Sequence, residues 1–126
     1  MLKISGVPMT RGGCFDIDAE RAAAFAQASG STVMASADEV IASSDMVYIC
    51  TWTSEHQSLV EKCITAGKPF FCEKPLSIGL SEASEMHSAA VASGLTHQCG
   101  LILRRSPAYL WARELISDPA AGAPMA

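Results

Sequence analysis

Short apolar runs alternate with helical segments along this chain, and this alternation limits the possible folds more than any other feature. Residues 46–50 and 69–72 form continuous apolar runs of strand length, which is typical of strands buried on both faces. A shorter run ends at Phe15, and residues 95–103 are expected to form a fourth strand. Strands alternating with helices indicate an α/β fold, in which helices cover both faces of a parallel sheet.

Start and stop signals delimit the expected helices. Asp18 is expected to cap a helix that ends at Gly30. Capping-box patterns begin at Ser36 and at Ser54, and they predict a short helix and a longer one. The remaining signals are Gly67 and Gly94 as helix stops, and Ser106 with Pro107 as the start of the last helix.

Composition excludes several classes of protein. The chain has 126 residues, of which 49% are hydrophobic and 17% charged, so it can bury the core of one domain. The net charge of −4 leaves no basic surface for nucleic acid, and no apolar run approaches the ~20 residues that cross a membrane. Its five cysteines are odd in number and form no C-x-x-C pair, and the start of the chain has no secretory pattern. We therefore expect buried free thiols, no metal site and a cytoplasmic location.

The carboxyl ends of parallel strands meet at one edge of a sheet, where ligands bind in such folds. Asp16 follows the first expected strand. It is suited to the ribose hydroxyls of a dinucleotide and would repel a 2′-phosphate, which favours NAD over NADP. The alternative is that Asp16 only caps the next helix, and the spacing alone does not separate the two.

Thr51, Trp52 and His56 lie in the turn after the 46–50 strand. The free amides of a helix start suit a polar or anionic ligand there. The residues alone favour the alternative that His56 is a surface histidine on a capping turn. Trp52 is either a lid over a flat ring or a partly exposed aromatic side chain.

Glu73, Lys74 and Pro75 follow the 69–72 strand and form the sharpest feature of the chain. Proline restricts the lysine to an extended backbone, and Glu73 is placed to hold its charge and position. An ammonium held in this way can hydrogen-bond a substrate hydroxyl while hydride leaves. The alternative is an exposed charged turn. After the last strand, Arg104 and Arg105 are candidates for a phosphate or carboxylate.

The segment from Ala66 to Leu76 (AGKPFFCEKPL) resembles the hallmark of the Gfo/Idh/MocA oxidoreductases. The likeness extends in order over residues 13–117 and includes Phe15 to Asp18, Asp45 to Thr51 and Gly100 to Pro107. It implies a partial doubly wound, Rossmann-like domain that binds NAD or NADP, from a dehydrogenase acting on sugars or polyols. Lys74 is then the catalytic residue, and the implied cofactor-binding residues are Asp16, Thr51, Trp52, His56, Glu73, Lys74, Pro75 and Arg105.

Two departures from the family pattern shape the expected function. Residues 1–12 lack the G-x-G-x-x-G phosphate loop, so they are expected to be a leader or a remnant of the first strand. Residues 118–126 stand where a substrate domain would begin. We therefore expect a nucleotide-binding domain that is a fragment and inactive alone. The alternatives are a non-catalytic binding or dimerisation module and a small complete enzyme. Without the central first strand, exposed strand edges would favour a homo-oligomer.

Overall fold

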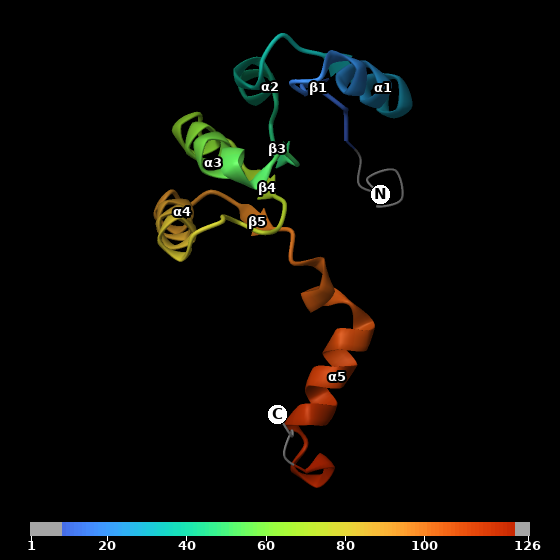
Figure 1. The fold of residues 1–126 in the computed structure, drawn as a ribbon, viewed down its shortest axis with the longest axis vertical. Coiled ribbons are helices and arrows are strands. Elements are labelled where there is room, and N and C mark those ends of the chain that lie inside the picture. Colours follow the sequence, from blue (N-terminus) through green and yellow to red (C-terminus); the bar gives the residue numbers. More distant parts are fainter. Residues whose placement is uncertain (1–8, 123–126) are drawn as a thin grey trace.

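Parallel strands and helices alternate along the part of the chain that the computed structural model describes, residues 9–122 (Figure 1). The described part of the chain also holds three short 3-10 turns, η2 (Thr53–Glu55), η3 (Ile102–Arg105) and η4 (Pro119–Ala121). The expectation for the leader falls mostly on residues 1–8, which lie outside the described residues. The strands and helices are β1 (Gly13–Cys14), α1 (Ala19–Ser29), β2 (Thr32–Val33), α2 (Ala37–Ser43), β3 (Val47–Ile49), α3 (His56–Thr65), β4 (Phe70–Cys72), α4 (Leu80–Ala92), β5 (His97–Cys99) and α5 (Pro107–Ser117).

The strands form two separate parallel sheets. β1 pairs with β2, and β3, β4 and β5 form a second sheet in that order. In the second sheet Ile49 is opposite Cys72, and Cys72 is opposite Cys99, so these three strands end level with one another. The expected parallel α/β architecture is therefore confirmed. Among residues 9–122, β1 and β3 each pair on one side only, which makes both of them edge strands.

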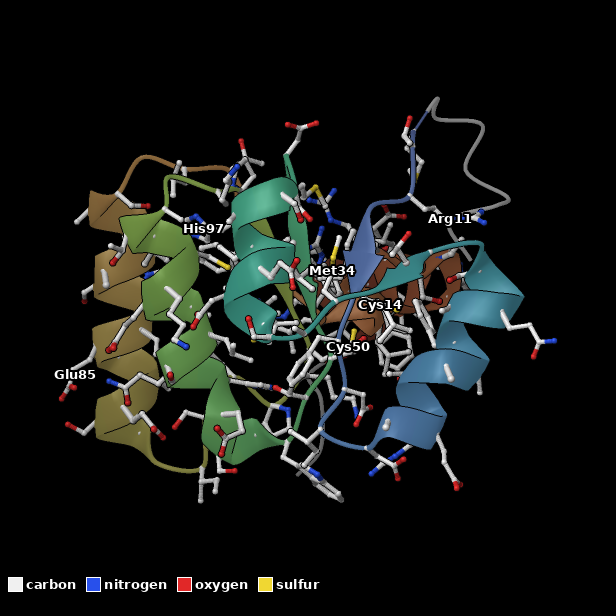
Figure 2. The ribbon with its side chains drawn as sticks, turned by 90° about the horizontal axis from the view of Figure 1, so that it is seen from above. Arg11, Cys14, Met34, Cys50, Glu85 and His97 are labelled. Carbon is white, nitrogen blue, oxygen red and sulfur yellow. The ribbon has the colours of Figure 1, made fainter. Side chains whose placement is uncertain are left out.

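The three-stranded sheet is covered on one face and not on both. Val47 and Ile49 are buried under α3, whereas the intervening Tyr48 is 47% exposed and pairs with Phe71. Figure 2 shows α3 and α4 together on one side of the strands. The expectation that the 46–50 run is buried on both faces is thus wrong, since no described helix covers the Tyr48 side. The core beneath α3 and α4 consists of Ile41, Val47, Ile49, Val60, Cys63, Phe70, Cys72, Met86 and Ala90.

Local capping chemistry explains where most helices begin and end. The Asp18 carboxylate accepts from the first amides of α1, and Gly30 ends that helix in the left-handed conformation with φ of 77°. The Ser36 hydroxyl accepts from the Glu39 amide at the start of α2. Ser54, however, does not cap α3, because a 3-10 turn precedes the helix and no side chain bonds its first amides. Ser106 likewise makes no side-chain cap bond, although Pro107 occupies the first turn as expected.

Two strand predictions need correction. Thr32–Val33 forms a strand that sequence patterning missed, since it is only two residues long and both are exposed. The strand expected over 95–103 is confined to His97–Cys99. Gly100 makes the last bond to β4, donating its N–H to the Cys72 carbonyl at 2.8 Å. β4 itself ends at Cys72 before Pro75, so the chain beyond Gly100 has no strand to pair with and coils into η3.

Helix α5 extends away from the other elements (Figure 1). Its main contacts are with the flanking turns η3 and η4, and none of its residues is buried. No helix within residues 9–122 has the length and apolar character that a membrane span requires. Several large apolar side chains of this region are exposed: Leu101, Ile102, Leu103, Tyr109, Trp111, Leu115 and Ile116.

Candidate functional site

The segments that follow β3, β4 and β5 meet at one edge of the sheet, because these parallel strands end in register. This edge carries Thr51 and Trp52 after β3, Glu73 to Pro75 after β4, and Gly100 after β5. Asp16 follows β1 in the other sheet. Arg105 lies in η3, beyond the edge, and is exposed. Within residues 9–122, no hydrogen bond or ion pair links Asp16 or Arg105 to the lysine turn.

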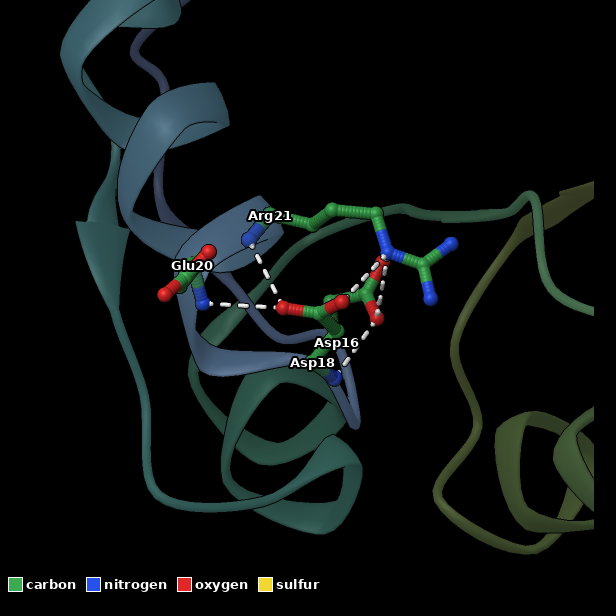
Figure 3. Close-up of polar contacts among 4 residues, drawn as sticks. All are labelled: Asp16, Asp18, Glu20 and Arg21. Atoms are coloured by element: carbon green, nitrogen blue, oxygen red, sulfur yellow. Dashed lines mark hydrogen bonds and ion pairs between the residues drawn. The ribbon is translucent and has the colours of Figure 1, made fainter.

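Asp18 and not Asp16 caps helix α1 (Figure 3). One Asp18 oxygen, Oδ1, accepts from the amides of Glu20 at 3.0 Å and Arg21 at 3.2 Å. The Arg21 side chain donates to the other Asp18 oxygen at 3.1 Å. The backbone N–H of Arg21, followed by its side-chain bond, holds the pKa of Asp18 below the ordinary value of 3.8. The structure thus assigns the capping role to Asp18.

Asp16 is left with a partly exposed carboxylate. Its Oδ1 accepts the backbone N–H of Asp18 at 2.9 Å, which shapes the turn before the helix. Arg21 Nε lies 4.0 Å from the same oxygen and is closer to Asp18. The Asp16 side chain is 38% exposed, so a ribose hydroxyl can reach it. The helix-capping alternative for Asp16 is therefore wrong.

His56 is buried, with only 1% of its surface exposed. Nδ1 lies 3.0 Å from the Pro75 carbonyl oxygen and 3.3 Å from that of Leu76. On the other side of the ring, Nε2 lies 3.3 Å from the Thr51 carbonyl oxygen. The alternative of a surface histidine is therefore wrong. His56 is the first residue of α3, and its ring lies between the turn after β3 and the turn after β4.

The Glu73 carboxylate holds the backbone of Lys74 and not its ammonium group. Glu73 Oε2 accepts the Lys74 backbone N–H at 3.1 Å. Both residues lie beyond the end of β4, and the peptide bond between Lys74 and Pro75 is cis. Lys74 is exposed, and among residues 9–122 its ammonium group makes no ion pair. The expectation that Glu73 holds the lysine's charge is thus corrected: it fixes the position of the turn and leaves the ammonium free to meet a ligand.

Gly100 is a site residue that the sequence analysis did not single out. A Cβ at this position would lie 2.6 Å from Glu73 Oε2 and 3.2 Å from Glu73 Cα. Only a residue without a side chain leaves room for the Glu73 carboxylate here. The available signal was a glycine directly after a strand, where close approach of another backbone is common.

Thr51 and Trp52 form an open part of the edge. Trp52 is 68% exposed, and Thr51 Oγ1 donates to the Trp52 carbonyl at 3.4 Å. The Glu55 amide donates to the same carbonyl at 2.9 Å and closes the η2 turn. An exposed indole beside this turn can cover a flat aromatic ring.

The cysteines divide into two groups. Cys63 and Cys72 are buried, and burial raises their thiol pKa values to about 11 and about 12. Cys14 and Cys99 are partly buried, whereas Cys50 is exposed at the end of β3, which corrects the expectation that it is a buried hydrophobe. All five are free thiols. Within the described residues, no group of three potential metal ligands gathers in one place.

Comparisons with known proteins agree with this architecture. The model of an oxidoreductase family with an NAD-binding Rossmann fold (Gfo/Idh/MocA) matches residues 11–101. Inositol 2-dehydrogenase of Cereibacter sphaeroides is 35% identical over 114 residues, which are 90% of this chain and 34% of that protein. The 1,5-anhydro-D-fructose reductase of Ensifer adhaerens is 34% identical, over 86% of this chain and 33% of that protein.

Solved structures show the same relationship. UDP-N-acetylglucosamine 3-dehydrogenase GnnA from Acidithiobacillus ferrooxidans matches with a TM-score of 0.74 and 34% identity, over 82% of this chain and 34% of that one. GenD2 from gentamicin A biosynthesis, in complex with NAD, matches with a TM-score of 0.80 and 26% identity, over 90% of this chain and 33% of that one. The chain spans about a third of the length of the relatives that it matches. It belongs to the Gfo/Idh/MocA family of oxidoreductases with an NAD-binding Rossmann fold.

Proposed function

We propose that residues 13–117 are the nucleotide-binding domain of an NAD(P)-dependent oxidoreductase that acts on an alcohol carbon of a sugar or polyol. The observation that carries this proposal is the Lys74 turn. Its backbone is fixed by Glu73 and its ammonium group is exposed at the edge where the strands end. The relatives named as an inositol dehydrogenase and an anhydrofructose reductase support the substrate class.

The side chains of this edge fit two parts of a dinucleotide. The partly exposed Asp16 carboxylate, which follows β1 in the other sheet, suits the adenosine ribose hydroxyls, whereas Trp52 and Lys74 suit the nicotinamide end. The first amides of α1 are already bonded to Asp18, so this helix offers no free cradle for the pyrophosphate. The bound cofactor would supply the hydride chemistry. The chain's own residues would orient it, with Lys74 donating a hydrogen bond to the substrate hydroxyl and taking part in its proton transfer.

The other proposed cofactor-binding residues are assigned to the cofactor, to the lysine turn or to an anionic group. Thr51, Trp52 and His56 belong to the turn along the cofactor, and Glu73 with Pro75 fixes the lysine. Arg105 would meet a phosphate or carboxylate. We propose NAD over NADP, because the Asp16 carboxylate repels a 2′-phosphate and Arg21 is tied more closely to Asp18.

Titration of the chain with NADH, followed by nicotinamide fluorescence, tests the proposal. We expect saturable binding that weakens in Asp16→Asn and in Lys74→Ala. Asp45→Asn is the matched control, since Asp45 is exposed and precedes β3, at the opposite end of the strands from the site. Absence of any response at millimolar NADH would refute autonomous nucleotide binding and favour the non-catalytic module.

We also propose a cytoplasmic location and self-association of the chain. Five free thiols suit a reducing compartment. Within residues 9–122, β1 and β3 present unpaired edges, which favour pairing with a second copy. Light scattering tests the second proposal, and a monodisperse monomer would count against it.

A further inference from the structure

His56 is the one polar side chain that is fully buried within residues 9–122. A buried polar group costs free energy unless it is hydrogen-bonded, so its partners indicate what the side chain does. Both ring nitrogens have carbonyl partners, which come from two different turns. The ring therefore lies between the turn after β3 and the turn after β4 and contacts a carbonyl oxygen of each.

The two turns that meet at His56 are those assigned to the cofactor and to the catalytic lysine. Nε2 faces the Thr51 carbonyl, one residue before Trp52. Nδ1 faces the Pro75 carbonyl, one residue after Lys74, at the shorter distance of 3.0 Å. Carbonyl oxygens only accept hydrogen bonds, so each contact requires a proton on its own ring nitrogen. The ring bonds both turns at once only as the imidazolium, with protons on Nδ1 and Nε2.

Helix α3 gives the ring a rigid base. His56 is the first residue of this helix, and Val60 and Cys63, one and two turns further along, are buried with exposures of 1% and 0%. The buried ring contacts both turns from the side of the core. Because the ring is buried, it does not contact a ligand in solution directly.

We propose that His56 is a positioning residue, which locks the turn after β3 to the turn after β4 so that Thr51 and Lys74 keep a fixed relative position. The consequence for catalysis rests on the proposed function of Lys74. The coupling of the two turns through His56 is independent of that function, and it can be measured without cofactor.

Three substitutions of His56 distinguish its hydrogen bond to Pro75 from its hydrogen bond to Thr51. In His56→Asn the side-chain amide nitrogen takes the place of Nδ1 and can bond only the Pro75 side. In His56→Gln the amide nitrogen takes the place of Nε2 and can bond only the Thr51 side. His56→Ala keeps neither bond, and His87→Ala on the exposed face of α4 is the matched control.

Hydrogen exchange with peptide-resolved mass spectrometry gives the readout on the whole chain. Loss of one hydrogen bond corresponds to about fivefold faster local exchange. We expect this acceleration in both turns for His56→Ala, in 51–53 only for His56→Asn, and in 74–77 only for His56→Gln. His87→Ala should change neither turn. With NADH present, binding should weaken in all three His56 variants.

A purely structural role for His56 predicts a different result. Exchange would then rise throughout α3 and β4, with the same pattern in His56→Asn and His56→Gln, and that outcome would overturn the proposal. Unchanged exchange in His56→Ala would also overturn it. Nitrogen NMR of the wild-type imidazole covers the case in which the variants do not fold, because an unprotonated Nδ1 or an unprotonated Nε2 contradicts the lock. Failure of NADH to bind, with the split exchange pattern intact, would refute the proposed function alone.

Discussion

Replacement of Gly100 by alanine tests the arrangement that fixes the Lys74 turn. The new Cβ would lie 2.6 Å from Glu73 Oε2, 3.1 Å from Cδ and 3.2 Å from Cα. The carboxylate can swing away, but it then releases the Lys74 N–H, at a cost of about 1 kcal/mol for an exposed hydrogen bond. The close approach to the Glu73 backbone cannot be relieved by rotation, and such overpacking adds about 1–2 kcal/mol.

The expected destabilisation by Gly100→Ala is therefore about 2–3 kcal/mol, which corresponds to a decrease in Tm of about 8–11 °C for a chain of this size. Circular dichroism during thermal unfolding measures it. Gly12→Ala is the matched control, because its Cβ would meet only Ser44 Oγ at an ordinary 3.6 Å. Equal melting temperatures for the two variants would refute the close approach of Gly100 to Glu73.

A double-mutant cycle locates the origin of the effect. Glu73→Ala removes the carboxylate atoms that the new methyl group would meet and leaves the backbone of residue 73 where it is. We expect Gly100→Ala to cost about 1 kcal/mol less in the Glu73→Ala background than in the wild type. Strict additivity of the two substitutions would show that the carboxylate is not what the new methyl group displaces.

Three other perturbations test the helix cap, the thiols and the ribose-side carboxylate. Asp18→Ala should lower Tm at neutral pH. Because the Arg21 N–H lowers the pKa of Asp18 below 3.8, the stabilisation is present above that pH and is lost as the pH falls through the folded-state value, so the two melting curves should converge in acid. Iodoacetamide at pH 8 should label exposed Cys50 well before Cys72, whose pKa burial raises to about 12, and mass spectrometry of the native and unfolded chain checks this. Asp16→Ser should raise the affinity for NADPH relative to NADH, and an unchanged ratio in fluorescence titrations would contradict its ribose-side role.

Local signals in the sequence predicted much of the fold. The Asp18 cap and the Gly30 stop depend on the chemistry of a few neighbouring residues, and both occur in the structure. The apolar runs around Val47 and Phe70 became paired parallel strands for the same reason, since short runs of this kind must be buried.

Strand length and coverage were decided by partners distant in the sequence. Residues 95–103 have a strand-like composition, but β4 ends at Cys72, and the ladder therefore stops at Gly100. The 46–50 run has apolar residues on both faces, yet only one face meets helices, and Tyr48 is left half exposed. Neither result can be read from a local pattern, because each depends on what lies beside the strand in space.

The candidate site divides in the same way. The sequence by itself determined which family the chain resembles and which residues follow its strands, Asp16 and Lys74 among them. Motif spacing and the succession of strands along the chain can be read from neighbouring residues. Only the tertiary structure decided that His56 lies buried between two turns, that Glu73 holds a backbone amide, and that Gly100 makes room for it. His56 meets Pro75 across 19 positions of the chain, and Glu73 meets Gly100 from the neighbouring strand. Such contacts exist only once the parallel strands bring their ends together.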